Sequence, residues 1–143
     1  MNYFLNFFGT LYVFTFYQLH AENTALYASF FNATYNCSNP LVLNGTVTVY
    51  LDEDININGC LPFVAGPLLS PTDQLIFTST NNCRVVITSN TIVDFATFLT
   101  QGQTVIITGN GQLIVEKGAY LIFNNNTLLA KKNGRIIFIE SST

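Results

Sequence analysis

Short apolar runs recur along the C-terminal half of the chain, and residues that favour turns separate them. Four runs follow one another at Leu113–Val115, Tyr120–Phe123, Leu128–Ala130 and Ile136–Ile139. Between them lie Gly118, the three asparagines at 124–126 and the segment 131–134, as expected for strands joined by tight corners. The runs start near positions 113, 121, 128 and 136, so three strands and three corners form a unit of about 23 residues. Looser runs continue the rhythm upstream, at Leu75–Thr78, Val85–Ile87, Ile92–Phe95 and Val105–Ile107.

A motif of the form Asn-x-x-Φ-x-Φ, in which Φ is apolar, repeats at a similar interval. Its five copies begin at Asn44, Asn58, Asn82, Asn110 and Asn133. The intervals from Asn58 onward are 24, 28 and 23, and the interval from Asn44 to Asn110 is three times 22. Repeats of this length are typical of one coil of a parallel β-solenoid, in which equivalent corners stack and asparagine side chains can bond from coil to coil.

The pattern therefore predicts an all-β fold, a short parallel β-solenoid (β-helix) with coils of about 23 residues and an N-terminal capping segment. The alternative is a β-sandwich, in which the Asn-Gly pairs mark hairpin turns. Alternation near the start of the repeats gives the inward face of the first coil, at Val47, Val49, Leu51, Ile55 and Ile57. We divide the chain into a signal peptide at 1–21, a capping segment at 22–42 and a solenoid domain at 43–143. Within the capping segment, the sequence ALYASFF predicts a short helix over the open end of the core.

The first residues of the chain resemble a secretory signal peptide. Residues 3–19 form an apolar stretch without a charge, and Ala21 supplies a small residue for cleavage before the first acid, Glu22. The stretch is shorter than the roughly 20 residues that a spanning helix needs, so we expect no membrane span after cleavage. An uncleaved anchor and a buried core segment are the alternatives. We expect a secreted or extracellular cell-surface protein.

Charge and sequons are consistent with this location. Only 9% of the residues are charged and the formal net charge is -3, which leaves no basic surface able to track nucleic acid. Four sequons of the form Asn-x-Ser/Thr are candidate glycosylation sites, at Asn32, Asn36, Asn44 and Asn125.

Three cysteines are evenly spaced along the chain, at Cys37, Cys60 and Cys83, with an interval that matches the repeat. This spacing predicts a disulfide between adjacent coils, since neighbouring strands lie about 4.8 Å apart. We favour Cys60 with Cys83, because both follow an asparagine of the repeat motif. Cys37 with Cys60 is the second choice, and three free thiols are the third.

Residues suited to catalysis are few, and we predict no catalytic residue, metal site or cofactor. The single histidine, His20, lies in the signal peptide, so histidine-dependent hydrolysis and histidine-ligated metals are excluded for the mature chain. Asp52 and Asp54 fall on one face of a strand and are a candidate acidic site, with a solvated strand end as the alternative. The stretch 54–59 matches the first half of a calcium loop, but Ala65 stands where that loop needs glutamate.

The stretch NGQLIVEKGAYLIFNNNTLLAKKNGRIIF resembles coils of the right-handed parallel β-helix group, which includes pectin-lyase-like enzymes and adhesin-type surface proteins. The resemblance covers about residues 44–139 and concerns the fold pattern alone. The acidic calcium ligands and basic residue that such enzymes share have no residue-by-residue counterpart here.

Together these features favour a non-enzymatic secreted or cell-surface solenoid with a structural, adhesive or binding role. Carbohydrate, other surface proteins and end-to-end copies of the same chain are the expected partners. The alternative is a carbohydrate-active or carbohydrate-binding module that uses Asp52 and Asp54, as the N-terminal fragment of a longer protein.

Overall fold

A computed structural model describes residues 23–97, 99 and 102–140. The predicted signal peptide and its cleavage point lie outside the described residues. The elements are β1 (Thr24–Tyr27), α2 (Ala28–Thr34), β2 (Leu41–Leu43), β3 (Val47–Tyr50), β4 (Ile55–Ile57), β5 (Phe63–Ala65), β6 (Gln74–Ser79), β7 (Arg84–Ile87), β8 (Ile92–Asp94), the 3-10 helix η1 (Phe95–Thr97), β9 (Thr104–Gly109), β10 (Gln112–Val115), β11 (Tyr120–Ile122), β12 (Thr127–Ala130) and β13 (Arg135–Phe138).

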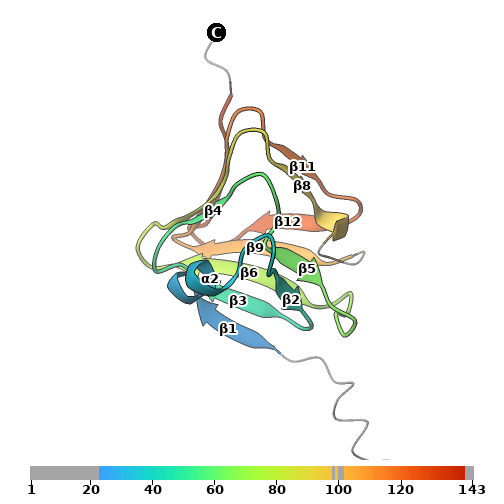
Figure 1. The fold of residues 1–143 in the computed structure, drawn as a ribbon. Helices are drawn as coiled ribbons and strands as arrows, with labels where there is room; N and C mark the ends of the chain where they lie inside the picture. The colour runs from blue at the N-terminus through green and yellow to red at the C-terminus, as the bar shows by residue number, and fades with distance from the viewer. Residues whose placement is uncertain (1–22, 98, 100–101, 141–143) are drawn as a thin grey trace, which may run out of the picture.

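The strands stack in parallel, coil upon coil. A five-stranded sheet has the order β1-β3-β6-β9-β12, and a four-stranded sheet has the order β13-β10-β7-β4. Strand β8 pairs with β11, and β2 pairs with β5. Figure 1 shows the five-stranded sheet running from the blue β1 to the orange β12. This arrangement confirms the predicted β-solenoid. The β-sandwich alternative was wrong, because every strand pair of the described residues is parallel.

Coil length varies along the stack. In the five-stranded sheet the coils are shortest at the two ends, where Thr24 pairs with Val47 and Thr104 pairs with Thr127. The middle coils are longer, because Val47 pairs with Leu75 and Leu75 pairs with Val105. These coils contain the longer connections, residues 66–73 between β5 and β6 and residues 95–103, which begin with η1, between β8 and β9. The predicted coil length therefore describes the two ends of the stack, and insertions lengthen the coils between them.

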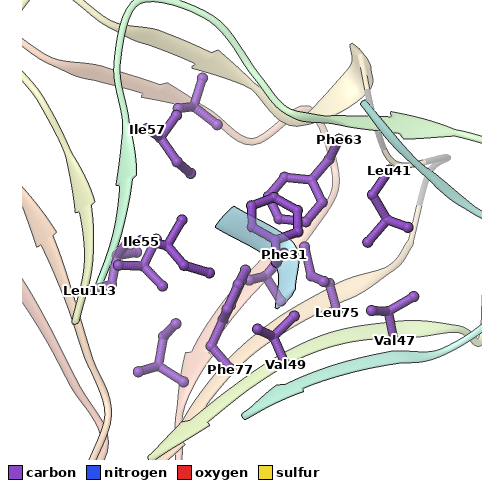
Figure 2. Close-up of a cluster of buried hydrophobic side chains, with 14 of the residues drawn as sticks. Phe31, Leu41, Val47, Val49, Ile55, Ile57, Phe63, Leu75, Phe77 and Leu113 are labelled. Atoms are coloured by element: carbon purple, nitrogen blue, oxygen red, sulfur yellow. The ribbon is translucent and has the colours of Figure 1, made fainter. Parts of the chain in front are cut away.

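Apolar side chains of alternate positions fill the inside of the solenoid. The residues predicted to face inward in the first coil, Val47, Val49, Leu51, Ile55 and Ile57, are all buried. Figure 2 shows how the aromatic and aliphatic side chains of several coils meet in this core. The Phe63 ring stacks on Phe31 at 4.9 Å between centroids and meets Phe77 edge-on at 6.1 Å.

The N-terminal segment contributes both strands to the sheets and a helix to the core. Strand β1 pairs with β3 and so extends the five-stranded sheet, and β2 pairs with β5. The helix α2 between them turns Ala28 and Phe31 into the core, while Phe30 is exposed. The part of the chain that covers the core is therefore α2 itself, flanked by strands of the solenoid.

Candidate functional site

One corner of the solenoid stacks asparagines in three successive coils. Asn82, Asn110 and Asn133 each stand just before β7, β10 and β13, whose first residues Arg84, Gln112 and Arg135 are register partners. The Nδ2 of Asn133 donates to the Oδ1 of Asn110 at 3.2 Å, and the Nδ2 of Asn110 donates to a backbone carbonyl of the preceding coil, that of Thr80, at 3.5 Å. We call Asn82, Asn110 and Asn133 the asparagine corner.

Asn44 and Asn58 carry the same sequence motif, but they lie at other corners. Ile57 pairs with Ile87, so Asn58 stands beside Thr88, whose Oγ1 donates to its Oδ1 at 2.9 Å. Asn44 precedes β3, and its Oδ1 accepts a hydrogen bond from the backbone N–H of Leu68 at 3.0 Å. The prediction of five equivalent corners was therefore wrong for these two residues. Inserted residues lengthen some coils, so copies of the same motif at similar sequence intervals fall at different corners.

A polar groove lies at the asparagine corner. Its volume is about 610 Å³, and it is lined by Asn82, Asn110, Gln112, Lys132, Asn133, Gly134 and Arg135. The lining contains amides and two cations but no acid. We call these seven residues the polar groove.

The register of the strands explains why the charge of Arg135 is not neutralised. Four residues occupy the same position in successive coils: Asp54, Arg84, Gln112 and Arg135. The guanidinium of Arg84 pairs with Asp54 at 2.9 Å, whereas Arg135 faces the neutral Gln112. Neither Lys132 nor Arg135 has an ion-pair partner among the described residues, and both are exposed. The groove is therefore locally positive on a chain whose formal net charge is -3.

In the first coil, the same corner is acidic and contacts the cap. The Oδ1 of Asp52 accepts the backbone N–H of Ser29 at 2.9 Å, and its Oδ2 accepts the Ser29 hydroxyl at 2.5 Å. Glu53 accepts from the Nδ2 of Asn32 at 2.7 Å. These contacts join α2 to the turn between β3 and β4. The hydrogen bond from the Ser29 hydroxyl, followed by that from its backbone, lowers the pKa of Asp52.

Asp54 joins the first coil to the second. Its Oδ1 accepts the backbone N–H of Arg84 at 2.8 Å, and its Oδ2 accepts from the guanidinium at 2.9 and 3.2 Å. Asp52 and Asp54 thus each bind a different neighbour, a helix in one case and a strand end in the other. No group of three or more His, Cys, Asp or Glu side chains that could hold a metal ion occurs in the described part of the chain.

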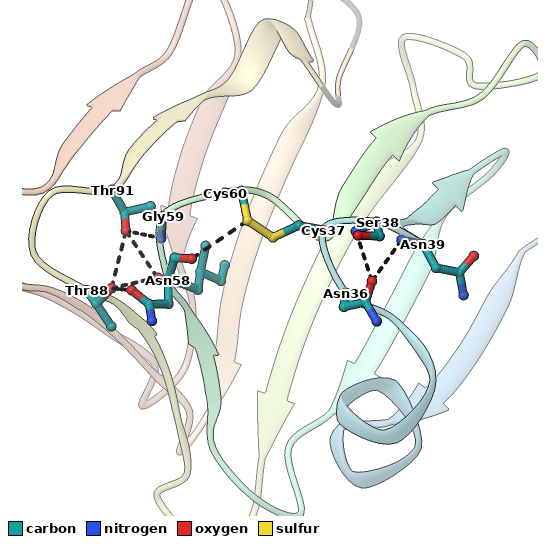
Figure 3. The surroundings of a disulfide bond; sticks show 10 residues. Asn36, Cys37, Ser38, Asn39, Asn58, Gly59, Cys60, Thr88 and Thr91 are labelled. Carbon is teal, nitrogen blue, oxygen red and sulfur yellow. Dashed lines mark hydrogen bonds between the residues drawn. A yellow bond between two sulfur atoms is a disulfide. The ribbon is translucent and has the colours of Figure 1, made fainter.

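The disulfide joins Cys37 to Cys60, with Cα atoms 5.9 Å apart. Figure 3 shows it linking the segment after α2 to the turn after β4. The favoured pairing of Cys60 with Cys83 was therefore wrong, and the second choice is observed. Ile55 pairs with Val85, a separation of 30, so this coil is longer than the cysteine interval of 23 and does not bring Cys83 level with Cys60. Cys83 is a half-buried free thiol that packs against the core.

The four sequons differ in what their side chains contact. Asn125, Asn32 and Asn36 are exposed, whereas Asn44 is half-buried. The Nδ2 of Asn32, the atom to which a glycan is attached, donates to Glu53 and to the carbonyl of Asp54. The Oδ1 of Asn36 accepts from the backbone of the turn at 38–39. Asn125 lies in a corner between β11 and β12 and has a left-handed φ of 68°.

No family model, curated protein or solved structure matches the chain. The likeness to the β-helix group is therefore a likeness of architecture, parallel strands in stacked sheets. No helix in the described residues is long and apolar enough to cross a membrane.

Sequence reasoning missed the polar groove and the contacts of Ser29 and Asn32 with the acidic turn. The sequence did contain a signal for the Ser29 contact, because the interval from Ser29 to Asp52 is 23, the length of one coil. The sequence contained no signal for the groove, since only the register of the strands brings Lys132 and Gln112 together.

Proposed function

We propose that this protein is a non-enzymatic, secreted or cell-surface solenoid that works by binding an extended polar molecule, a glycan of another surface or matrix component, along its wall. The polar groove at the asparagine corner is the observation that carries the proposal. It presents amide groups from three successive coils, and coils of a solenoid repeat at about 4.8 Å. Stacked coils of this kind offer extended binding surfaces.

The contacts of the acidic residues favour binding over catalysis. A general acid and base need carboxylates directed at one substrate. Here Asp52 holds the cap through Ser29, and Asp54 holds the next coil through Arg84. These structural contacts support the adhesin-like side of the β-helix resemblance rather than its enzymatic side.

Three features support export. The disulfide between Cys37 and Cys60 is typical of proteins that fold in an oxidising compartment. The N-terminal apolar stretch resembles a signal peptide, and sequons recur on exposed positions such as Asn36 and Asn125.

Incubation of the mature chain with a panel of neutral and charged polysaccharides, with and without calcium, tests the proposal. We expect retention of the protein on at least one polysaccharide, no release of reducing ends or unsaturated products, and weaker retention of the Asn110→Ala variant. Asn56→Ala, an exposed asparagine on β4 outside the groove, is the matched control. Cleavage that disappears in Asp52→Asn or Asp54→Asn would support the enzymatic alternative, and absence of binding to every polysaccharide would also refute the proposal.

A further inference from the structure

We infer that the polar groove takes an anionic glycan, one whose sugar residues carry carboxylate or sulfate groups. This inference rests on the proposed function and narrows it from any polar chain to a negatively charged one. It depends on three features of the groove: its uncompensated cations, its stacked amides and the rigid backbone that holds both.

The cations define the sign of the ligand. Lys132 and Arg135 line the groove, and the lining contains no acid to neutralise them. Arg84 occupies the same register row as Arg135 two coils earlier, but its charge is paired with Asp54. An acceptor with negative charge can therefore bind at Arg135 without first displacing an internal partner. A guanidinium binds carboxylate and sulfate oxygens through a pair of parallel hydrogen bonds.

The amide side chains of the groove match the hydroxyl groups of a sugar chain. Asn82, Asn110, Gln112 and Asn133 each offer a donor and an acceptor, the combination that sugar hydroxyls require. Because equivalent groups recur from coil to coil, a chain lying along the solenoid axis meets an amide at every step.

Other polyanions fit this lining less well. The groove has no aromatic side chain on which a nucleobase could stack, and two cations are few for a phosphate backbone. It also has no apolar pocket of the kind that anchors a peptide. A hydroxyl-rich chain with spaced negative charges satisfies both the amides and the cations.

The backbone holds Lys132 at a fixed place. Its φ is 56°, and a hydrogen bond of 2.9 Å from the Gly134 N–H to the Lys131 carbonyl closes the turn around it. A second bond of 2.9 Å, from the Lys131 N–H to the Ile107 carbonyl, attaches this turn to the preceding coil. The lysine thus stands at the tip of a tight turn between β12 and β13, beside the asparagine corner. Less conformational entropy is lost on binding when the turn is already ordered.

Affinity measurements with three probes test the inference: heparin as a sulfated glycan, alginate as a carboxylated glycan and dextran as a neutral one. We expect the mature chain to bind at least one anionic probe more tightly than dextran, and to bind it more weakly as the NaCl concentration is raised. The double variant Lys132→Gln, Arg135→Gln should lose roughly 5- to 20-fold in affinity for that probe. Lys131→Gln, an exposed lysine of the same turn outside the lining, is the matched control and should lose little.

The outcomes separate this inference from the proposed function. Equal binding of dextran and the anionic probes, or a double variant as tight as the wild type, overturns the anionic ligand and leaves the binding role standing. Binding of no polysaccharide overturns both. Single-stranded DNA is the competitor control: if it displaces heparin at equal charge concentration, the groove attracts any polyanion and the glycan assignment is wrong.

Discussion

Ser29 holds Asp52 with two hydrogen bonds, from its backbone N–H at 2.9 Å and from its hydroxyl at 2.5 Å. The two residues are 23 positions apart, so the helix α2 is attached to the coil that follows it. Because α2 also places Phe31 in the core, this contact holds the helix against the solenoid.

Acid should weaken this attachment. The Ser29 hydroxyl and backbone lower the pKa of Asp52 below its ordinary value of 3.8. A carboxyl whose folded-state pKa is depressed stabilises the fold above its unfolded pKa, and that stability is lost as the pH falls through the folded pKa. We therefore expect unfolding by urea to become easier as the pH drops below about 4. The Ser29→Ala variant should show a smaller change over the same pH range, and an equal change in both proteins would contradict the assignment.

Removal of the Phe31 ring should open the core. Phe31 is 2% exposed and stacks on Phe63, whereas its neighbour Phe30 is 54% exposed. Phe31→Ala should lower the free energy of unfolding by about 3–5 kcal/mol, because a buried aromatic is lost and a cavity remains. Phe30→Ala should change it by less than about 1 kcal/mol. Urea denaturation of the two variants checks the difference, and similar losses would show that α2 does not cover the core as described.

The disulfide should stabilise the chain, and the third cysteine should not. Replacement of Cys37 and Cys60 by serine should cost about 3 kcal/mol of unfolding free energy, since the bond closes a loop with a sequence separation of 23. Cys83→Ser is the control and should keep the disulfide intact. Peptide mapping without reduction is the direct measurement. Detection of a linked Cys60–Cys83 peptide would contradict the Cys37–Cys60 disulfide and support the pairing that the sequence favoured.

Glycan occupancy should follow the surroundings of each sequon. Asn125 is exposed, whereas the Asn44 side chain accepts from Leu68 and packs so closely on Gly66 that a Cβ there would clash with it. When the chain is expressed in a eukaryotic secretory pathway, we expect Asn125→Gln to remove one glycan from the intact mass and Asn44→Gln to remove none. Loss of a glycan from the Asn44 variant would mean that this loop is open when the sugar is attached.

The strands could be predicted because their signal is local. Short apolar runs, broken by asparagine and glycine, predict every strand between positions 75 and 139, although the runs extend one residue too far at Phe95, Phe123 and Ile139. The buried row from Val47 to Ile57 follows from the same period of two. A solenoid could be inferred because a repeat of twenty-odd residues requires each coil to bury its inner face on the next.

Which residues meet across coils depended on the tertiary structure. The connections 66–73 and 95–103 add residues to two coils, so equal spacing in the sequence no longer means equal position in the stack. For this reason Cys60 lies beside Cys37 and not beside Cys83.

The same shift moves Asn44 and Asn58 away from the asparagine corner and places Asp54 beside Arg84. The sequence by itself determined the strands, their inward faces and the coiled architecture, since these depend on neighbours along the chain. Only the tertiary structure decided the disulfide, the members of the asparagine corner and the positive charge of the polar groove, because each depends on the register between coils.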